Sequence, residues 1–179
     1  FHQFDHQRRA ADHGNQVAGI VRRVRNTGQR QIDPLPRQQL QHALHYKQDQ
    51  HSERNPHSPT KDFRDVTTSV AVKDRIALTD TAHLRAGIGY DRREAKRVYY
   101  WPTGSADATN AVLEYVQQLA PEQQWYASAA RRTRFPTIKD RYSARMGAAL
   151  PNPDLAPEHA THLELGLRGS WWQGSQLQA

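Results

Sequence analysis

Apolar and polar residues alternate in several separate stretches of this chain, and strict alternation predicts a β-strand with one apolar face and one polar face. The clearest example lies at 161–168. One face would carry Thr161, Leu163, Leu165 and Leu167, and the other would carry His162, Glu164, Gly166 and Arg168. This pattern gives no sign of the 3.6-residue period of an amphipathic helix.

The same reading predicts about eight strands along the chain, and their approximate positions are 16–25, 40–49, 66–72, 83–91, 111–119, 124–130, 161–168 and a last one from Trp171. The stretch 1–15 would hold the end of one strand and a loop. The segment 111–119 fits a helical stripe as well as a strand, and we interpret it as a strand because its neighbours alternate. Tyr90 would lie at a strand end, where an aromatic residue at a membrane interface is expected.

Proline, glycine and charged residues interrupt these strands and predict connections of two lengths. The long polar connections would be 50–61, 92–110 and 132–158, and the short ones 26–38, 74–81, 120–123 and 169–170. Transmembrane β-barrels of the outer-membrane type alternate long extracellular loops with short periplasmic turns. Trp125 and the pair Trp171–Trp172 would then lie near short turns, in an aromatic girdle.

Composition changes the choice of fold class. Only 36% of the residues are hydrophobic, the mean hydropathy is -0.93 and the formal net charge is +7, so a compact apolar core would be difficult to fill. A barrel with a polar interior needs only every second residue of a strand to be apolar. We therefore expect an all-β protein whose fold is an antiparallel transmembrane β-barrel, with about eight strands in this chain.

Three ordered blocks carry a family resemblance: Arg132–Thr137 (RTRFPT), Asn152–Glu158 (NPDLAPE) and Glu164–Leu167 (ELGL). Together they resemble the late barrel region of TonB-dependent outer-membrane receptors. The resemblance implies mainly structural roles for the motif residues Thr133, Phe135, Pro136, Thr137, Asn152, Pro153, Leu155, Pro157, Glu158, Glu164 and Gly166. Pro136 would end strand pairing, Asn152 would form an Asx-type turn, and Glu158 would anchor the returning loop through a buried hydrogen bond or ion pair.

The resemblance also implies a function. Residues 1–179 would be part of the 22-stranded barrel of such a receptor, a fragment without signal peptide, plug or TonB box, located in the bacterial outer membrane. The whole receptor would import a scarce ligand with energy supplied through TonB. The expected ligand is a small molecule or metal chelate such as a ferric siderophore, haem, cobalamin or a sugar, and the other expected partner is outer-membrane lipid.

Three arginines are candidates for ligand binding at the extracellular mouth, because guanidinium groups suit an anionic chelate. They are Arg131, Arg132 and Arg134. A structural role for this block is the favoured alternative. The residues expected to line the lumen, as contacts of the wall and plug, are Gln41, His45, Lys47, His83, Arg85, His162, Glu164 and Arg168.

Other function classes find little support in the sequence. There is no cysteine, no glycine-rich phosphate loop and no catalytic motif, so we expect neither an enzyme nor a cofactor. His2 and His6 have the spacing of a helical metal pair but lack a third ligand, and we expect no metal site. A passive porin-like barrel remains one alternative. The other is a soluble basic β-protein that binds nucleic acid, which the dispersed positive charge disfavours.

Overall fold

The protein is one antiparallel sheet of nine strands in the described part of the chain, in which each strand pairs with its neighbours in sequence. The computed structural model describes residues 4–10, 18–54, 59–143, 150–170 and 177–178. The strands are β1 (Phe4–Ala10), β2 (Ala18–Ile32), β3 (Gln38–Arg54), β4 (Lys61–Ala77), β5 (Ala82–Val98), β6 (Ser105–Ala120), β7 (Gln123–Arg134), β8 (Glu158–Gly169) and β9 (Leu177–Gln178), and one short helix, α1, spans Ile138–Tyr142. The predicted all-β antiparallel fold is confirmed.

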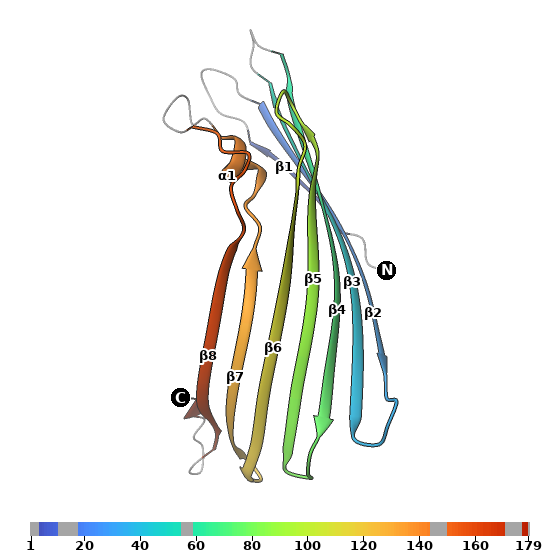
Figure 1. The fold of residues 1–179 in the computed structure, drawn as a ribbon, viewed down its shortest axis with the longest axis vertical. Helices are drawn as coiled ribbons and strands as arrows, with labels where there is room; N and C mark the ends of the chain where they lie inside the picture. The colour runs from blue at the N-terminus through green and yellow to red at the C-terminus, as the bar shows by residue number, and fades with distance from the viewer. Residues whose placement is uncertain (1–3, 11–17, 55–58, 144–149, 171–176, 179) are drawn as a thin grey trace.

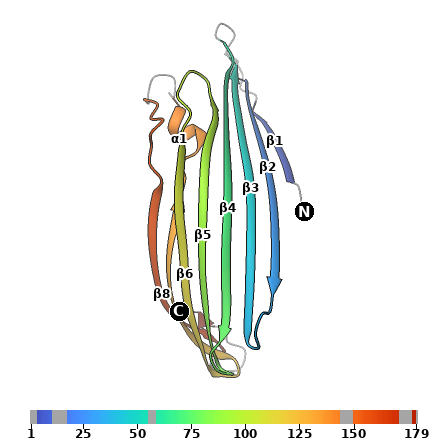
Figure 2. The same cartoon turned by 45° about the vertical axis from the view of Figure 1, so that its right-hand side comes forward.

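The sheet is long, curved and open, and its connections divide between its two ends (Figures 1 and 2). At one end, here called the turn end, lie the connections 33–37, 78–81 and 121–122. At the other, here called the loop end, lie 99–104 and 135–157, the latter containing α1. The expected division is therefore present, but only 135–157 is long among the connections between described strands.

One face of the sheet, the outer face, is apolar over a broad central band. Cross-strand register places Leu44, Val70 and Tyr90 on this face, and Ile88 lies opposite Val72 on the same side. These side chains are exposed, as are Leu113, Leu163 and Leu165 further along the sheet. A row of exposed leucine, valine and isoleucine is unfavourable in water, so this band requires an apolar environment such as lipid.

The opposite face, the inner face, is polar and charged. The register aligns Gln41 with Lys73, and Arg85 with Glu114, on this face. All the residues expected to face a lumen lie on it: Gln41, His45, Lys47, His83, Arg85, His162, Glu164 and Arg168. The two-residue period was therefore enough to assign both faces.

The strands are longer than the sequence indicated. Three successive strands, β3, β4 and β5, have 17 residues each, which at about 3.3 Å per residue gives roughly 56 Å. An outer-membrane apolar band is only about 25 Å tall, so these strands extend beyond it as polar ladders. The expected connections 50–61 and 92–110 are wrong for that reason, because their polar residues continue the strands to Arg54 and Val98.

Aromatic residues mark the edges of the apolar band rather than the ends of strands. Tyr90 lies in the middle of β5, so its predicted position at a strand end is wrong. Arg92, two residues nearer the loop end, begins the polar part of β5 and forms ion pairs with Glu94 and Asp107. Toward the turn end, Trp125 lies beside the short connection 121–122, as predicted, and packs against Tyr115 with ring centroids 5.2 Å apart. Trp171 and Trp172 lie outside the described residues.

Candidate functional site

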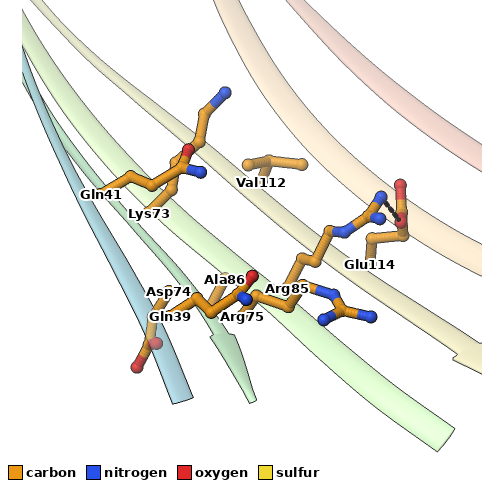
Figure 3. Close-up of a pocket in the computed structure, with 9 residues that line it drawn as sticks. All are labelled: Gln39, Gln41, Lys73, Asp74, Arg75, Arg85, Ala86, Val112 and Glu114. Atoms are coloured by element: carbon orange, nitrogen blue, oxygen red, sulfur yellow. Dashed lines mark hydrogen bonds and ion pairs between the residues drawn. The ribbon is translucent and has the colours of Figure 1, made fainter. Parts of the chain in front are cut away.

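The inner face carries a cavity of about 560 Å³ near the turn end (Figure 3). Four neighbouring strands, β3 to β6, supply its lining, and the inner-face residues are Gln39, Gln41, Lys73, Arg75, Arg85, Val112 and Glu114. Because these strands pair in register, side chains two residues apart on one strand join those of the next strand in a continuous surface. A polar cavity thus follows from the alternation itself.

A glycine provides the floor of this cavity. Gly87 lies between Lys73 and Val112 in the cross-strand register. A Cβ atom at position 87 would lie 3.0 Å from Lys73 Cγ and 3.0 Å from Val112 Cγ1. The missing side chain lets the stem of Lys73 lie across the strand, and any larger residue would displace it.

Positive charge exceeds negative charge in this cavity. Arg75 lies directly opposite Arg85 in the β4–β5 ladder, and Lys73 is two residues from Arg75 on the same face. Among the described residues that line the cavity, Glu114 is the only carboxylate on the inner face, and it accepts a 2.7 Å hydrogen bond from Arg85 Nη1. Asp74 points away from the cavity, and its Oδ2 accepts from Gln38 (Figure 3).

A second polar cluster, buried at the loop end, holds α1 against the inner face. Arg141 of α1 donates to Asp65 Oδ2 of β4, and only 1% of the Arg141 side chain is exposed. Arg93 Nη1 of β5 lies 3.8 Å from the same carboxylate oxygen. Phe63 stacks on Tyr142 beside this group, with ring centroids 5.1 Å apart. The Asp65 carboxylate lies between the guanidinium groups of Arg93 and Arg141. It therefore joins α1 to β4 and β5, two strands that are far from α1 in the sequence.

The first turn of α1 is fixed by a capping box. Thr137 is the N-cap, its hydroxyl accepts from Asp140 N at 3.3 Å, and Asp140 Oδ2 accepts from Thr137 N at 2.8 Å. The hydrogen bond from the Thr137 backbone holds the pKa of Asp140 below its ordinary value, and its neighbours Arg134 and Arg141 act in the same direction. Thr137 ends the first motif block, and Asp140 lies three residues further on, which is the spacing of a capping box.

Replacing Asp140 with asparagine is expected to weaken this cap by at most about 1 kcal/mol, because the carboxylate is partly exposed. Because the pKa of Asp140 is depressed in the folded state, its stabilising contribution is complete above the unfolded-state pKa of about 3.9. The contribution is lost as the pH falls through the lower folded-state pKa. Limited proteolysis within 135–157 should therefore be slower for the wild type than for Asp140→Asn at pH 6. The difference should disappear near pH 2, and a difference that persists there would contradict the capping role.

A smaller cavity, of about 470 Å³, opens beside this cluster at the loop end. Trp101, Tyr142 and the two arginines Arg93 and Arg141 contribute to its wall, and the returning segment 153–157 closes one side. It is a concave site with an aromatic and polar wall, and Arg93 and Arg141 lie buried in that wall beside Asp65.

The three candidate arginines do not come together. Arg131 aligns with Ala111 and Thr161 and so lies on the outer face, exposed, whereas Arg132 and Arg134 face inward. Arg134 is paired with Asp140 at 3.3 Å and with Glu158 at 3.1 Å. The three candidate positions therefore divide between the two faces, because consecutive residues of a strand point to opposite faces.

The other motif residues build the connection 135–157 and its return. β7 ends at Arg134, before the buried Pro136, as expected, and Phe135 lies under the Arg93 guanidinium at 5.9 Å. The Asx-type turn is confirmed, because Asp154 N donates to Asn152 Oδ1 at 3.2 Å. Glu158 does form an ion pair, with Arg134, but its side chain is 71% exposed, so the expected burial is wrong.

The remaining motif residues fall at positions that pack or pair. Leu155 N donates to Asn152 O, while Pro153 and Pro157 are half-buried. Thr133 hydrogen-bonds His159 across the β7–β8 ladder at 3.0 Å. Glu164 accepts a 2.6 Å hydrogen bond from the Tyr126 hydroxyl, and the buried Gly166 lies opposite Tyr126 in register.

Sequence reasoning missed Asp65, Arg93, Lys73 and Arg75 as site residues. Lys73 and Arg75 could have been found by extending the alternation of 66–72 for three more residues, but Asp74 and Lys73 resembled a polar connection.

His6 lies in β1, a strand, while His2 lies outside the described residues. Within the described ranges no group of three or more histidine, aspartate or glutamate residues has the arrangement of a metal site.

In the part of the chain that the structure describes, no helix combines the length and the hydropathy needed to cross a bilayer.

Comparison with known proteins agrees with the fold. A family model described as "TonB dependent receptor-like, beta-barrel" matches residues 3–179. A solved structure described as "Copper transporter OprC" aligns with a TM-score of 0.68 and 17% sequence identity, over 86% of this chain and 28% of that chain. The present chain thus spans less than a third of the length of OprC. A comparison with curated proteins gave no sequence match.

Proposed function

We propose that this chain, which belongs to the TonB-dependent receptor β-barrel family, is part of the wall of a transporter that imports a scarce ligand. Members of this family are bacterial outer-membrane proteins, so the lipid of that membrane surrounds the apolar outer face. The observation that carries the proposal is the separation of faces on one sheet. Exposed Leu163 and Leu165 require lipid on one side, while charged residues and cavities on the other side require water or a polar partner.

The proposed orientation follows from the connections. Long loops of outer-membrane barrels are extracellular and short turns periplasmic, so the loop end with 135–157 would face the exterior. The cavity lined by Arg93, Trp101 and Tyr142 would then be open to arriving ligand. The proposed ligand is a small molecule or metal chelate that carries anionic groups, for example a ferric siderophore, and the energy source is TonB.

Of the three candidate arginines, Arg132 is the one we propose for ligand contact. It faces inward at the loop end and is exposed, and it has no ion pair among the described residues. Arg131 is its matched neighbour, with the same charge and chain position but on the outer face. The motif residues around them serve the architecture of the loop.

The test is uptake by the full-length protein in the outer membrane, with a panel of ferric siderophores, haem and cobalamin as probes. Uptake of at least one probe should disappear in a host that lacks TonB. Arg132→Gln should lower that uptake by about tenfold, the effect of one charge-assisted contact, and Arg131→Gln should leave it unchanged. Equal uptake with and without TonB would instead support a passive porin-like barrel.

A further inference from the structure

The cavity at the turn end holds two cations, Lys73 and Arg75, that form no ion pair with any residue the structure describes. Elsewhere on the inner face some arginines do have carboxylate partners: Arg23 Nε lies 2.6 Å from Asp49, and Arg141 is bound to Asp65. Within the described residues, neither Lys73 nor Arg75 forms an ion pair, and Arg75 Nε is buried without a hydrogen-bond partner. Only Arg85 is paired, with Glu114.

The register makes this arrangement unfavourable for the sheet. Arg75 and Arg85 are direct cross-strand partners on one face, and like charges directly opposite each other destabilise a sheet. Lys73, two residues along β4, adds a third positive charge on the same face. Three cations that repel one another beside a single carboxylate leave the cavity with an excess of about two positive charges.

We propose that Lys73, Arg75 and Arg85 form a binding site for a small anion with several carboxylate groups, at the turn end of the transport pathway. The proposal rests on the proposed transport function, because it names the chemistry of the ligand that this wall would meet after it leaves the loop end. Guanidinium groups form paired hydrogen bonds with carboxylates, and an ammonium group adds a third contact.

The shape of the cavity favours a small molecule over a segment of protein. Its volume of about 560 Å³ falls in the range of small-molecule sites, which is about 300–1,000 Å³. Gln39 and Gln41 lie on the same surface and offer amide donors beside the cations (Figure 3). Gly87 keeps the floor free of a side chain. A citrate-sized anion would therefore find donors on several sides.

The experiment is calorimetric titration of citrate into the full-length protein in detergent, for the wild type and for Arg75→Gln. Citrate is expected to bind the wild type, with an affinity that falls as salt is added. Arg75→Gln should weaken binding by about tenfold or more, since it removes one charge-assisted contact. Its urea midpoint should equal or exceed that of the wild type, because the replacement relieves the repulsion between Arg75 and Arg85.

The control is Arg131→Gln, which removes the same charge from the outer face and should bind citrate as the wild type does. Lys73→Gln provides a second variant and should also weaken binding. Absence of citrate binding by the wild type, or equal binding by the wild type and Arg75→Gln, would overturn the proposal. So would an Arg75→Gln protein that is less stable but retains its affinity, as a purely structural role requires. Citrate binding does not involve TonB, so failure here is distinguishable from failure of TonB-dependent uptake.

Discussion

Replacing Arg141 with alanine is expected to cost about 3–5 kcal/mol of stability, the usual effect of removing one partner from a buried ion pair. The guanidinium of Arg141 is almost completely buried and donates to Asp65 and, at 2.9 Å, to the Tyr142 hydroxyl. Its loss would leave the Asp65 carboxylate in a dry environment with only Arg93 nearby. The measurement is the free energy of unfolding in urea of the full-length protein in liposomes.

The same substitution should release the connection 135–157 from the inner face. Apart from this ion pair, α1 is attached there by Ile138 and by the stacking of Tyr142 on Phe63. Proteolytic cleavage within 135–157 should therefore accelerate together with the loss of stability. Arg132→Ala is the control, because Arg132 is exposed and should change the unfolding free energy by less than about 0.5 kcal/mol. A loss below 1 kcal/mol for Arg141→Ala, comparable with the control, would exclude the clamp.

Leu163→Lys is the second substitution with a large expected effect. Leu163 is 79% exposed on the outer face of β8, and a lysine on the lipid face of a barrel costs about 2–4 kcal/mol near the bilayer midplane. The penalty arises because the ammonium group must leave water or the side chain must bend toward the interface. The loss should appear in the free energy of unfolding measured in liposomes.

The adjacent residue supplies a matched control for Leu163. His162 lies on the same strand but on the inner face, so His162→Lys should change the unfolding free energy by well under 1 kcal/mol. If the outer face were in water, Leu163→Lys would cost no more stability than His162→Lys, since an exposed leucine tolerates replacement by lysine. Equal effects of the two substitutions would contradict the membrane assignment of the outer face.

The faces of the sheet could be predicted from sequence because they depend only on a two-residue period. Leu163 and Glu164 were assigned to opposite faces from alternation alone, and the register agrees. Strand ends were harder, because polar residues such as Arg92 and Glu94 occur both in loops and in the parts of strands that leave the membrane. The ambiguous segment 111–119 became part of β6 because it pairs with β5 and β7, which its own residues could not reveal.

The sites were predicted less well for a different physical reason. Asp65 and Arg141 are 76 residues apart, and no local pattern indicates that a five-residue helix will bring them together. Family motifs identified the segment 132–137 but not the division of Arg131, Arg132 and Arg134 between the two faces. Thr137 and Asp140, in contrast, lie within a single turn of helix, and the capping box they form is a local feature of the sequence.

The most direct test of a lipid-facing outer surface is a scan of single cysteines along β8, where residues 1–179 contribute no cysteine of their own. Positions 161–168 would be replaced one at a time in the full-length protein in outer membranes and treated with a water-soluble maleimide. Labelling is expected to alternate along the strand, with cysteines at 162, 164 and 168 labelled and those at 163, 165 and 167 protected by lipid. Uniform labelling of all positions would contradict a lipid-facing outer surface and with it the assignment of this sheet to a membrane barrel.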